Sequence, residues 1–237
     1  MLPNDQRVVL ISGANRGIGL AVAKHLYDAG FLLSLGARQP ESLGDTTANM
    51  SPQRVLAHRY DAEDASSHQA WVDATIDRFG RIDGLVNNAG IALDVDLEGD
   101  NDADLDKLWE VNVKAPISMT RKALPHLRAS AAGRVINVAS IAGKAVFGSG
   151  IGYSMSKFAL VALSHATRHA GWADGVRCTA LCPGYVSTDM TANVETIAQE
   201  EMIQPDDIGA LAVTVMSLSN NASVAELIVN CRNDVLM

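Results

Sequence analysis

The sequence predicts an α/β protein built around a parallel β-sheet with helices on both faces. Short apolar runs alternate with helical patterns along the 237 residues, which is the order of strands and helices in such folds. The runs are unbroken rather than alternating, as is typical of strands buried on both faces. With 48% apolar residues, the chain can bury one large core, so we expect a single domain, residues 1–237.

Seven apolar runs mark the expected strands. Several end in glycine or small polar residues, as expected where parallel strands border a ligand crevice. The runs are residues 7–11, 31–35, 54–60, 82–86, 133–139, 176–181 and 225–231.

Helical patterns fill most of the intervals between these runs, and capping residues define their ends. Gly80 stands where the second helix should stop, and either Asp61 or Asp64 should cap its beginning. Pro205 opens the last helix, a position that tolerates a missing amide hydrogen. The expected helices are about residues 18–29, 65–79, 103–129, 153–172 and 205–219.

Two prolines interrupt the third helical pattern. Because proline removes a backbone donor and its ring clashes with the preceding turn, Pro116 and Pro125 should kink this helix or end it early. The polar, turn-rich segment 41–53 should hold at most a short helix.

Charge and composition exclude several functional classes. The net charge is −8 and no dense cluster of Lys and Arg is present, so the electrostatic footprint of nucleic-acid binding is missing. No apolar run approaches a membrane span, and the first residues carry no secretory pattern; we expect a soluble cytoplasmic protein. The three cysteines lack metal-ligand or redox spacing, so we expect reduced thiols and no metal site.

Residues 12–19, which read Ser-Gly-Ala-Asn-Arg-Gly-Ile-Gly, connect the first strand to the first helix. Glycines let the backbone turn tightly and approach a pyrophosphate, whose charge the helix N-terminus stabilises. The spacing is G-x-x-x-G-x-G rather than the commoner G-x-G-x-x-G, and an ordinary strand-to-helix turn is the alternative. The candidate cofactor-binding residues here are Gly13, Asn15, Arg16, Gly17, Ile18 and Gly19.

The second strand ends at Ala37 and Arg38, where a nucleotide-binding βαβ unit meets the adenosine ribose. An acidic residue here would accept a hydrogen bond from the 2′-hydroxyl, but none is present. Arg38 would instead pair with a 2′-phosphate through charge-assisted hydrogen bonds. The sequence therefore favours NADP(H) over NAD(H); the alternative is that Arg38 is a solvated loop charge.

Further polar residues follow the third and fourth strands. Asp61 could accept a hydrogen bond from the adenine amino group, unless it serves as the helix cap. Asn88, Ala89 and Gly90 would form the rim of a cofactor crevice. Asn112 stands between two valines, and a buried amide there either ties backbone segments together or orders a water beside a site.

Tyr153 and Lys157 lie at i and i+4 of an expected helix and would share one face. An ammonium beside a phenol favours the phenolate, so the pKa of Tyr153 should fall toward neutrality and permit general acid or base catalysis. Ser140, just after the fifth strand, would add a hydroxyl that holds the reacting oxygen. By itself, however, such a pair can share a helix face by chance.

Together these residues make the sequence resemble the classical short-chain dehydrogenase/reductase family over nearly its whole length. The matches occur in the family's order, and the interval of 13 residues from Ser140 to Tyr153 is the usual one. The matching positions are residues 12–19, Asp61, residues 87–90, Asn112, Ser140, Tyr153, Lys157, Pro183, Gly184 and Thr188.

The resemblance implies a single Rossmann-type, doubly wound domain with a seven-stranded parallel sheet, commonly in a homotetramer or homodimer. It implies that Tyr153 donates the proton, that Ser140 orients the substrate oxygen, and that Lys157 holds the nicotinamide ribose. Asn112 would connect Lys157 to solvent through a water. The nicotinamide side would be bound by Pro183, Gly184, Val186 and Thr188.

Two features depart from this family. The segment that would form the substrate lid, about residues 188–204, is short, so the pocket should be open or partly closed by another subunit. Residues 229–237 lack the Asp-Gly-Gly ending that many members carry, so their usual C-terminal packing between subunits is not implied.

We therefore predict an NADP(H)-dependent oxidoreductase that interconverts a carbonyl and a secondary alcohol, with Tyr153 as general acid or base. The alternatives are an NAD-dependent alcohol dehydrogenase, in which Arg38 has no role, and a non-catalytic NADP(H)-binding sensor or scaffold. The expected partner is an apolar or amphipathic small-molecule carbonyl, because the candidate pocket residues are mostly apolar. They are Ile91, Val146, Phe147, Tyr185 and Met190, of which Val146 and Phe147 could equally belong to the core.

Overall fold

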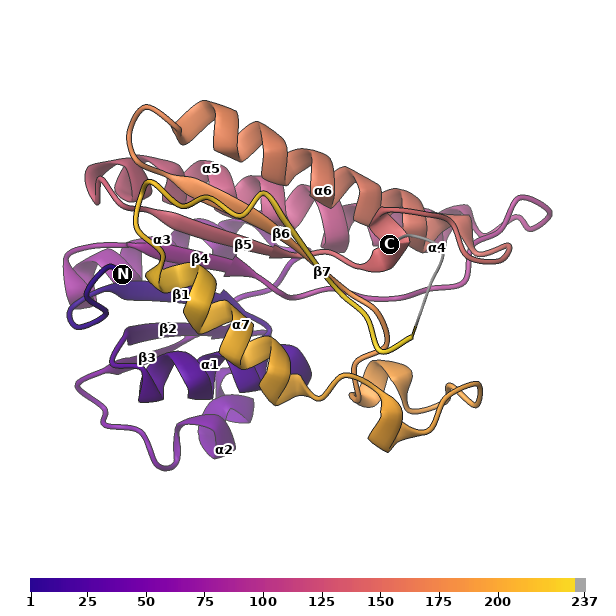
Figure 1. Ribbon diagram of the computed structural model, residues 1–237, viewed down its shortest axis with the longest axis horizontal. Helices are drawn as coiled ribbons and strands as arrows, with labels where there is room; N and C mark the ends of the chain where they lie inside the picture. Colours follow the sequence, from indigo (N-terminus) through magenta and orange to yellow (C-terminus); the bar gives the residue numbers. More distant parts are fainter. Residues whose placement is uncertain (233–237) are drawn as a thin grey trace.

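Seven parallel strands form one sheet in the order β3-β2-β1-β4-β5-β6-β7 (Figure 1). The structure is a computed structural model that describes residues 1–232; the sequence-based expectation for the C-terminal ending falls partly on residues 233–237, outside the described residues. The strands are β1 (Val8–Ser12), β2 (Leu32–Ala37), β3 (Val55–Arg59), β4 (Gly84–Asn87), β5 (Arg134–Val138), β6 (Arg177–Pro183) and β7 (Glu226–Val229).

Helices cover both faces of the sheet, which confirms the predicted doubly wound α/β architecture. On one face α1 and α7 pack against each other, and on the other lie α3, α5 and α6 (Figure 1). The helices are α1 (Gly17–Asp28), α2 (Gly44–Thr47), α3 (Ala65–Phe79), α4 (Asp102–Trp109), α5 (Ala115–Ala129), α6 (Ile151–Gly171) and α7 (Pro205–Ser217). Short 3-10 turns are η1 (Pro40–Leu43), η3 (Ile141–Gly143), η4 (Asp189–Thr191) and η5 (Gln199–Glu201).

The two-sided core explains why the strands read as unbroken apolar runs. In β1, Val9 and Ile11 join the core beneath α1 and α7, whereas Leu10 joins the core that includes Trp71 of α3 and Met119 of α5. Successive strand residues point to opposite faces of a sheet, so each residue of β1 meets an apolar layer. All five residues of this strand are buried.

The region between β4 and β5 is helical over almost the whole expected range, about residues 103–129. Helix α4 leads through a π-helical segment, η2 (Glu110–Lys114), which the sequence did not predict, directly into α5. Pro116 lies in the first turn of α5, and Pro125 lies inside this helix, which continues to Ala129. Of the two expected effects of proline, a kink or an early end, the early end is not observed at Pro125. Helix α5 packs Met119, Ala123 and Leu127 into the core on both sides of Pro125, and this burial maintains the helix through it.

The strand order creates a topological switch point between β1 and β4. From β1 the chain builds the sheet in one direction through β2 and β3, and from β4 in the other through β5, β6 and β7. In open parallel sheets, ligands bind at the carboxyl ends of the strands at this point. Across the described residues, no helix combines the length and the apolar character that crossing a membrane requires.

Candidate active site

The loop after β1 turns through two glycines with positive φ. Gly13 and Gly17 adopt φ values of 66° and 53°, which side chains other than glycine rarely tolerate. A Cβ added to Gly19 would lie 2.2 Å from the carbonyl oxygen of Gly13. The loop therefore requires glycine at these positions for its own packing.

The N-terminus of α1 fits an anionic group. Its N-cap residue, Arg16, has an extended backbone and no capping side-chain hydrogen bond, and no acidic residue stands in the first turn. The positive end of the helix dipole and its first amides thus lack an anionic side chain of the helix's own. These are the properties that suit a pyrophosphate, so the residues present fit a dinucleotide. Asn15 and Ile18 flank Arg16 and Gly17 in this loop.

Ser12, at the end of β1, joins the glycine loop to the segment after β4. Its hydroxyl accepts hydrogen bonds from the backbone amides of Asn88 and Ala89, each at 3.0 Å. The side-chain Nδ2 of Asn88 donates in turn to the carbonyls of Ser12 and Gly13, at 2.9 and 3.1 Å. Sequence reasoning did not single out Ser12; its place at the strand end, directly before Gly13, was the available signal.

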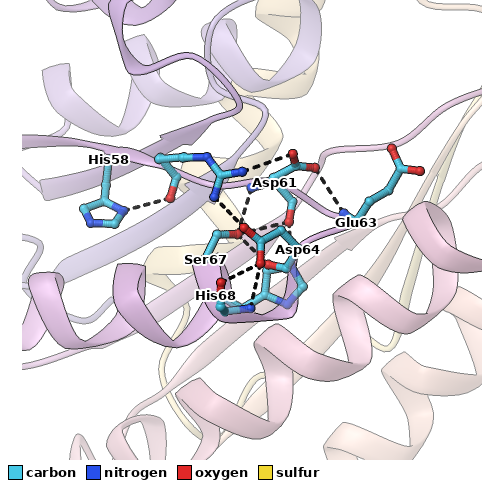
Figure 2. Close-up of polar contacts among 8 residues, drawn as sticks. His58, Asp61, Glu63, Asp64, Ser67 and His68 are labelled. Carbon is cyan, nitrogen blue, oxygen red and sulfur yellow. Dashed lines mark hydrogen bonds and ion pairs between the residues drawn. The ribbon is translucent and has the colours of Figure 1, made fainter.

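At the predicted adenosine end, Arg38 follows β2 and its side chain is exposed, whereas Asp61 follows β3 and is partly buried. Arg59 pairs with two carboxylates, that of Asp61 at 3.4 Å and that of Asp64 at 2.6 Å. Both aspartates are labelled in Figure 2. Asp64, rather than Asp61, caps α3, because its carboxylate accepts the Ser66 amide at 3.0 Å. Hydrogen bonds from Ser66 and Arg59 hold the pKa of Asp64 below its usual range.

Two buried side chains of α3 hold the backbone at Asp61 (Figure 2). The ring of His68 bonds the Asp61 carbonyl at 2.9 Å, and the Ser67 hydroxyl accepts the Asp61 amide at 3.0 Å. The loop that bears the predicted adenine contact is therefore fixed, while the Asp61 carboxylate accepts from Arg59 and from the Glu63 amide at 3.1 Å.

Ser140 and Tyr153 are brought together at the carboxyl end of β5. Ser140 caps η3: its hydroxyl accepts the Ala142 amide at 3.1 Å and donates to the Pro183 carbonyl at 3.4 Å. Tyr153 lies in the first turn of α6. Burial raises the pKa of the Tyr153 phenol, and a hydrogen bond with Ser140 acts in the opposite direction.

Lys157 lies one turn farther along α6 and is only 6% exposed. Its Nζ donates to the Val138 carbonyl at 2.9 Å and lies 5.5 Å from the centre of the Tyr153 ring. Burial lowers the pKa of Lys157 to about 8. The expectation that Lys157 brings the pKa of Tyr153 toward neutrality therefore differs from the structure, in which the ammonium is directed at a backbone carbonyl and burial dominates both groups.

Asn112 lies in the π-helical segment η2 and is 1% exposed. Its Oδ1 accepts the Ile91 amide, and its Nδ2 donates to the Ile91 carbonyl, both at 2.9 Å. A third hydrogen bond, to the Ser156 hydroxyl at 3.0 Å, connects Asn112 to α6. Of the two roles left open by the sequence, these contacts match the joining of backbone segments. Ser156, which donates to the Tyr153 carbonyl at 2.7 Å, was not found by sequence reasoning.

Gly90 completes this group. A Cβ added to it would lie 3.2 Å from Asn112 Oδ1 and 3.6 Å from Lys157 Nζ. The end of β4, η2 and α6 therefore converge where the fourth strand opens into its loop, and a side chain at position 90 would press on Asn112.

The segment after β6 meets the glycine loop. The Gly184 amide donates to the Val229 carbonyl of β7 at 2.8 Å, and Val186 forms an isolated parallel β-bridge with Ile203. Thr188 caps η4, and its methyl lies 3.3 Å from a Cβ added to Gly17. Next to it, Asp189 pairs with Arg16 at 3.0 Å. Residues 188–204, the predicted lid, thus begin against the predicted cofactor loop.

The candidate pocket residues are mostly exposed. Val146 and Phe147 are 54% and 45% exposed, so they do not belong to the core, which was the alternative left open by the sequence. Tyr185 and Met190 are also exposed, and Ile91 is partly buried against the core that includes Trp71.

Comparisons with known proteins point to one family. Residues 7–199 match the family model described as short chain dehydrogenase. Agropine synthesis reductase from Rhizobium rhizogenes is 42% identical over 230 residues, which are 96% of this chain and 53% of the relative. The chain therefore spans about half the length of this curated relative.

Solved structures agree in fold. Levodione reductase superposes with a TM-score of 0.86 and 29% identity, over 96% of each chain. An alcohol dehydrogenase from the archaeon Thermococcus sibiricus, complexed with 5-hydroxy-NADP, has a TM-score of 0.86 and 28% identity, over 94% of this chain and 95% of that one.

Proposed function

The chain belongs to the classical short-chain dehydrogenase/reductase family, and on that basis we propose that it is an NADP(H)-dependent oxidoreductase that acts on a carbonyl or secondary alcohol. The observation that carries the proposal is the meeting of Ser140, Tyr153 and Lys157 at the carboxyl end of β5, on the same edge of the sheet as a glycine loop suited to a pyrophosphate. A proton donor at this edge would face the nicotinamide end of a dinucleotide held by the glycine loop.

Each residue has a role that its surroundings support. Bound NADPH would supply the hydride. Tyr153, kept protonated because burial raises its pKa, would donate a proton to the oxygen that becomes the alcohol. Ser140 would orient that oxygen by a hydrogen bond. Lys157, charged at neutral pH because its pKa is about 8, would hold the ribose hydroxyls and favour negative charge at the reacting oxygen.

The preference for NADP(H) is supported by two arginines and by one related structure. Arg38 follows β2 where the 2′-phosphate would lie, and Arg16 stands at the N-terminus of α1. The alcohol dehydrogenase from Thermococcus sibiricus was solved with 5-hydroxy-NADP. A small carbonyl substrate, a cytoplasmic location and a homo-oligomer remain part of the proposal on the strength of the sequence.

The test is turnover by the purified protein. Consumption of NADPH and of NADH should be followed across a panel of apolar, amphipathic and charged ketones and aldehydes. We expect NADPH oxidation with at least one carbonyl class. Tight NADPH binding without oxidation across the panel would contradict the proposal and favour a sensor or scaffold.

A further inference from the structure

One carboxylate on the last strand joins two segments that carry the proposed catalytic groups. Glu226 is the first residue of β7. Its Oε2 accepts Lys144 Nζ at 2.6 Å and its Oε1 accepts His165 Nε2 at 2.7 Å. The three side chains are 24%, 28% and 39% exposed, so the cluster is partly shielded from water.

Lys144 belongs to the turn that holds Ser140. Ser140 is the N-cap of η3 and Lys144 is its C-cap, with the Lys144 amide bonded to the Ile141 carbonyl at 2.8 Å. A turn this short moves nearly as one body. Holding the Lys144 ammonium against β7 therefore also restrains the Ser140 hydroxyl.

His165 belongs to the helix that holds Tyr153 and Lys157. It lies eight residues after Lys157 in α6, about two helical turns along a similar face. The turn and the helix also touch directly, because a Cβ added to Gly143 would lie 2.7 Å from the Lys157 carbonyl oxygen. Small shifts of η3 against α6 would thus change the distance between Ser140 and Tyr153.

The ionised state of Glu226 strengthens its hydrogen bonds to Lys144 and His165. Hydrogen bonds from Lys144 and His165 lower the pKa of Glu226 below its ordinary value, so the carboxylate is ionised at neutral pH. Charge-assisted hydrogen bonds at these distances are stronger and better oriented than neutral ones. An exposed ion pair would contribute little, but this one connects three elements and is partly buried.

We propose that Glu226 is a positioning residue that sets Ser140 relative to Tyr153 by tying Lys144 of the η3 turn and His165 of α6 to β7. The inference rests on the proposed function. It goes beyond that function because Glu226 neither lies in the predicted motifs nor contacts Ser140, Tyr153 or Lys157 through any hydrogen bond described above.

The kinetic test compares Glu226→Ala, Glu226→Gln and Lys144→Ala with the wild type. Glu226→Ala should lower kcat on the order of tenfold, since small misplacements of catalytic groups reduce rate strongly, while KM for NADPH stays within about twofold. Glu226→Gln should recover part of the loss because it keeps a hydrogen bond to Lys144. Lys144→Ala should reproduce the loss of kcat. The double variant with both Glu226→Ala and Lys144→Ala should have a kcat no lower than either single variant, as expected of residues that act together.

Asp174→Ala is the matched control, since it removes an ion pair with Arg128 at 3.0 Å that touches neither η3 nor α6 near the site. It should leave kcat unchanged. Wild-type kcat in all Glu226 and Lys144 variants, with NADPH-dependent turnover present, would overturn this inference and leave the proposed function intact.

Crystal structures of the wild type and Glu226→Ala give a readout that does not depend on activity. We expect η3 to shift and the Ser140 hydroxyl to leave its bond to the Ala142 amide or to the Pro183 carbonyl. An η3 turn that superposes on the wild type, with both bonds kept, would refute the positioning role even if no carbonyl substrate is found.

Discussion

Lys157 Nζ donates a hydrogen bond to the Val138 carbonyl at 2.9 Å, which anchors the ammonium of α6 to the end of β5. Val138 stands two residues before Ser140. The buried Lys157 ammonium thus holds α6, which carries Tyr153, against β5, which leads to Ser140. The consequences of that burial can be measured.

The pH dependence of catalysis should show the lowered pKa of Lys157. Because that pKa is about 8, kcat/KM for NADPH, which reports the free enzyme, should fall as the pH rises through about 8 and Lys157 loses its charge. The pKa of Tyr153 is raised by burial, so its deprotonation should affect the profile only at higher pH. Lys157→Met should have low activity, and its kcat/KM should not fall near pH 8. Lys107→Met, the control at an exposed position of α4, should keep the wild-type pH profile. A profile flat through pH 8 in the wild type would contradict this assignment.

The free energy of unfolding should rise with pH over the range in which kcat/KM falls. The folded state holds Lys157 with a pKa of about 8, below its value in the unfolded chain. Above pH 8 the unfolded state therefore binds more protons, and the free energy of unfolding contributed by this group rises with pH until Lys157 is neutral in both states. Denaturant unfolding of the wild type and Lys157→Met at pH 7 and pH 10 should show the wild type gaining relative to the variant at the higher pH. An equal difference at both values would mean that burial does not disfavour the charge.

Tyr153→Phe should abolish most turnover without unfolding the protein. The change removes the phenol that bonds Ser140 but keeps the ring in α6, and loss of a general acid costs about 10²–10⁴-fold in rate. Measurement of kcat with the best carbonyl, together with thermal unfolding, checks the prediction. Tyr27→Phe, which removes a hydroxyl that accepts the Ser51 amide at the far end of α1, is the control and should retain kcat. Full activity of Tyr153→Phe would exclude it as the proton donor.

Arg38→Asp should reverse or reduce the preference for NADPH over NADH. The carboxylate would repel a 2′-phosphate and accept a hydrogen bond from a 2′-hydroxyl. We expect the ratio of the two kcat/KM values to fall by at least tenfold, which corresponds to about 1.4 kcal/mol of differential binding. Arg121→Asp makes the same charge change at an exposed position of α5 and should leave the ratio unchanged. An unaltered ratio in Arg38→Asp would remove Arg38 from the cofactor site and favour the NAD-dependent alternative.

The parts of this site that the sequence predicts are those set by local spacing. The glycine loop between β1 and α1 and the i, i+4 arrangement of Tyr153 and Lys157 depend on neighbouring residues, so they can be read from the chain. The apolar runs likewise predict the strands, most directly for the five inner strands, which are almost wholly buried between the two helical layers.

What the sequence does not predict depends on packing between distant elements. The Ser12 hydroxyl finds Asn88 only because β1 and β4 are adjacent, and Glu226 finds Lys144 only because β7 ends the sheet beside β6. The direction of the shift in the Tyr153 pKa could not be inferred either. The spacing shows that Lys157 is near, but it does not show how deeply both groups are buried. Asp61 and Asp64 were equivalent as caps until the path of β3 fixed which one faces α3.

Asn112→Ala should destabilise the fold as well as the site. The side chain satisfies both backbone groups of Ile91 and also donates to the Ser156 hydroxyl, from a position that is 1% exposed. Alanine would leave the two Ile91 groups without these partners, while Ser156 keeps its bond to the Tyr153 carbonyl. Each such group costs about 1–3 kcal/mol, so we expect the free energy of unfolding to fall by about 2–4 kcal/mol in denaturant titrations. Asn101→Ala, which loses an exposed hydrogen bond to the Asp94 carbonyl, should change it by less than about 0.5 kcal/mol. Equal effects of the two substitutions would show that the η2 segment does not depend on Asn112 for its attachment to β4 and α6.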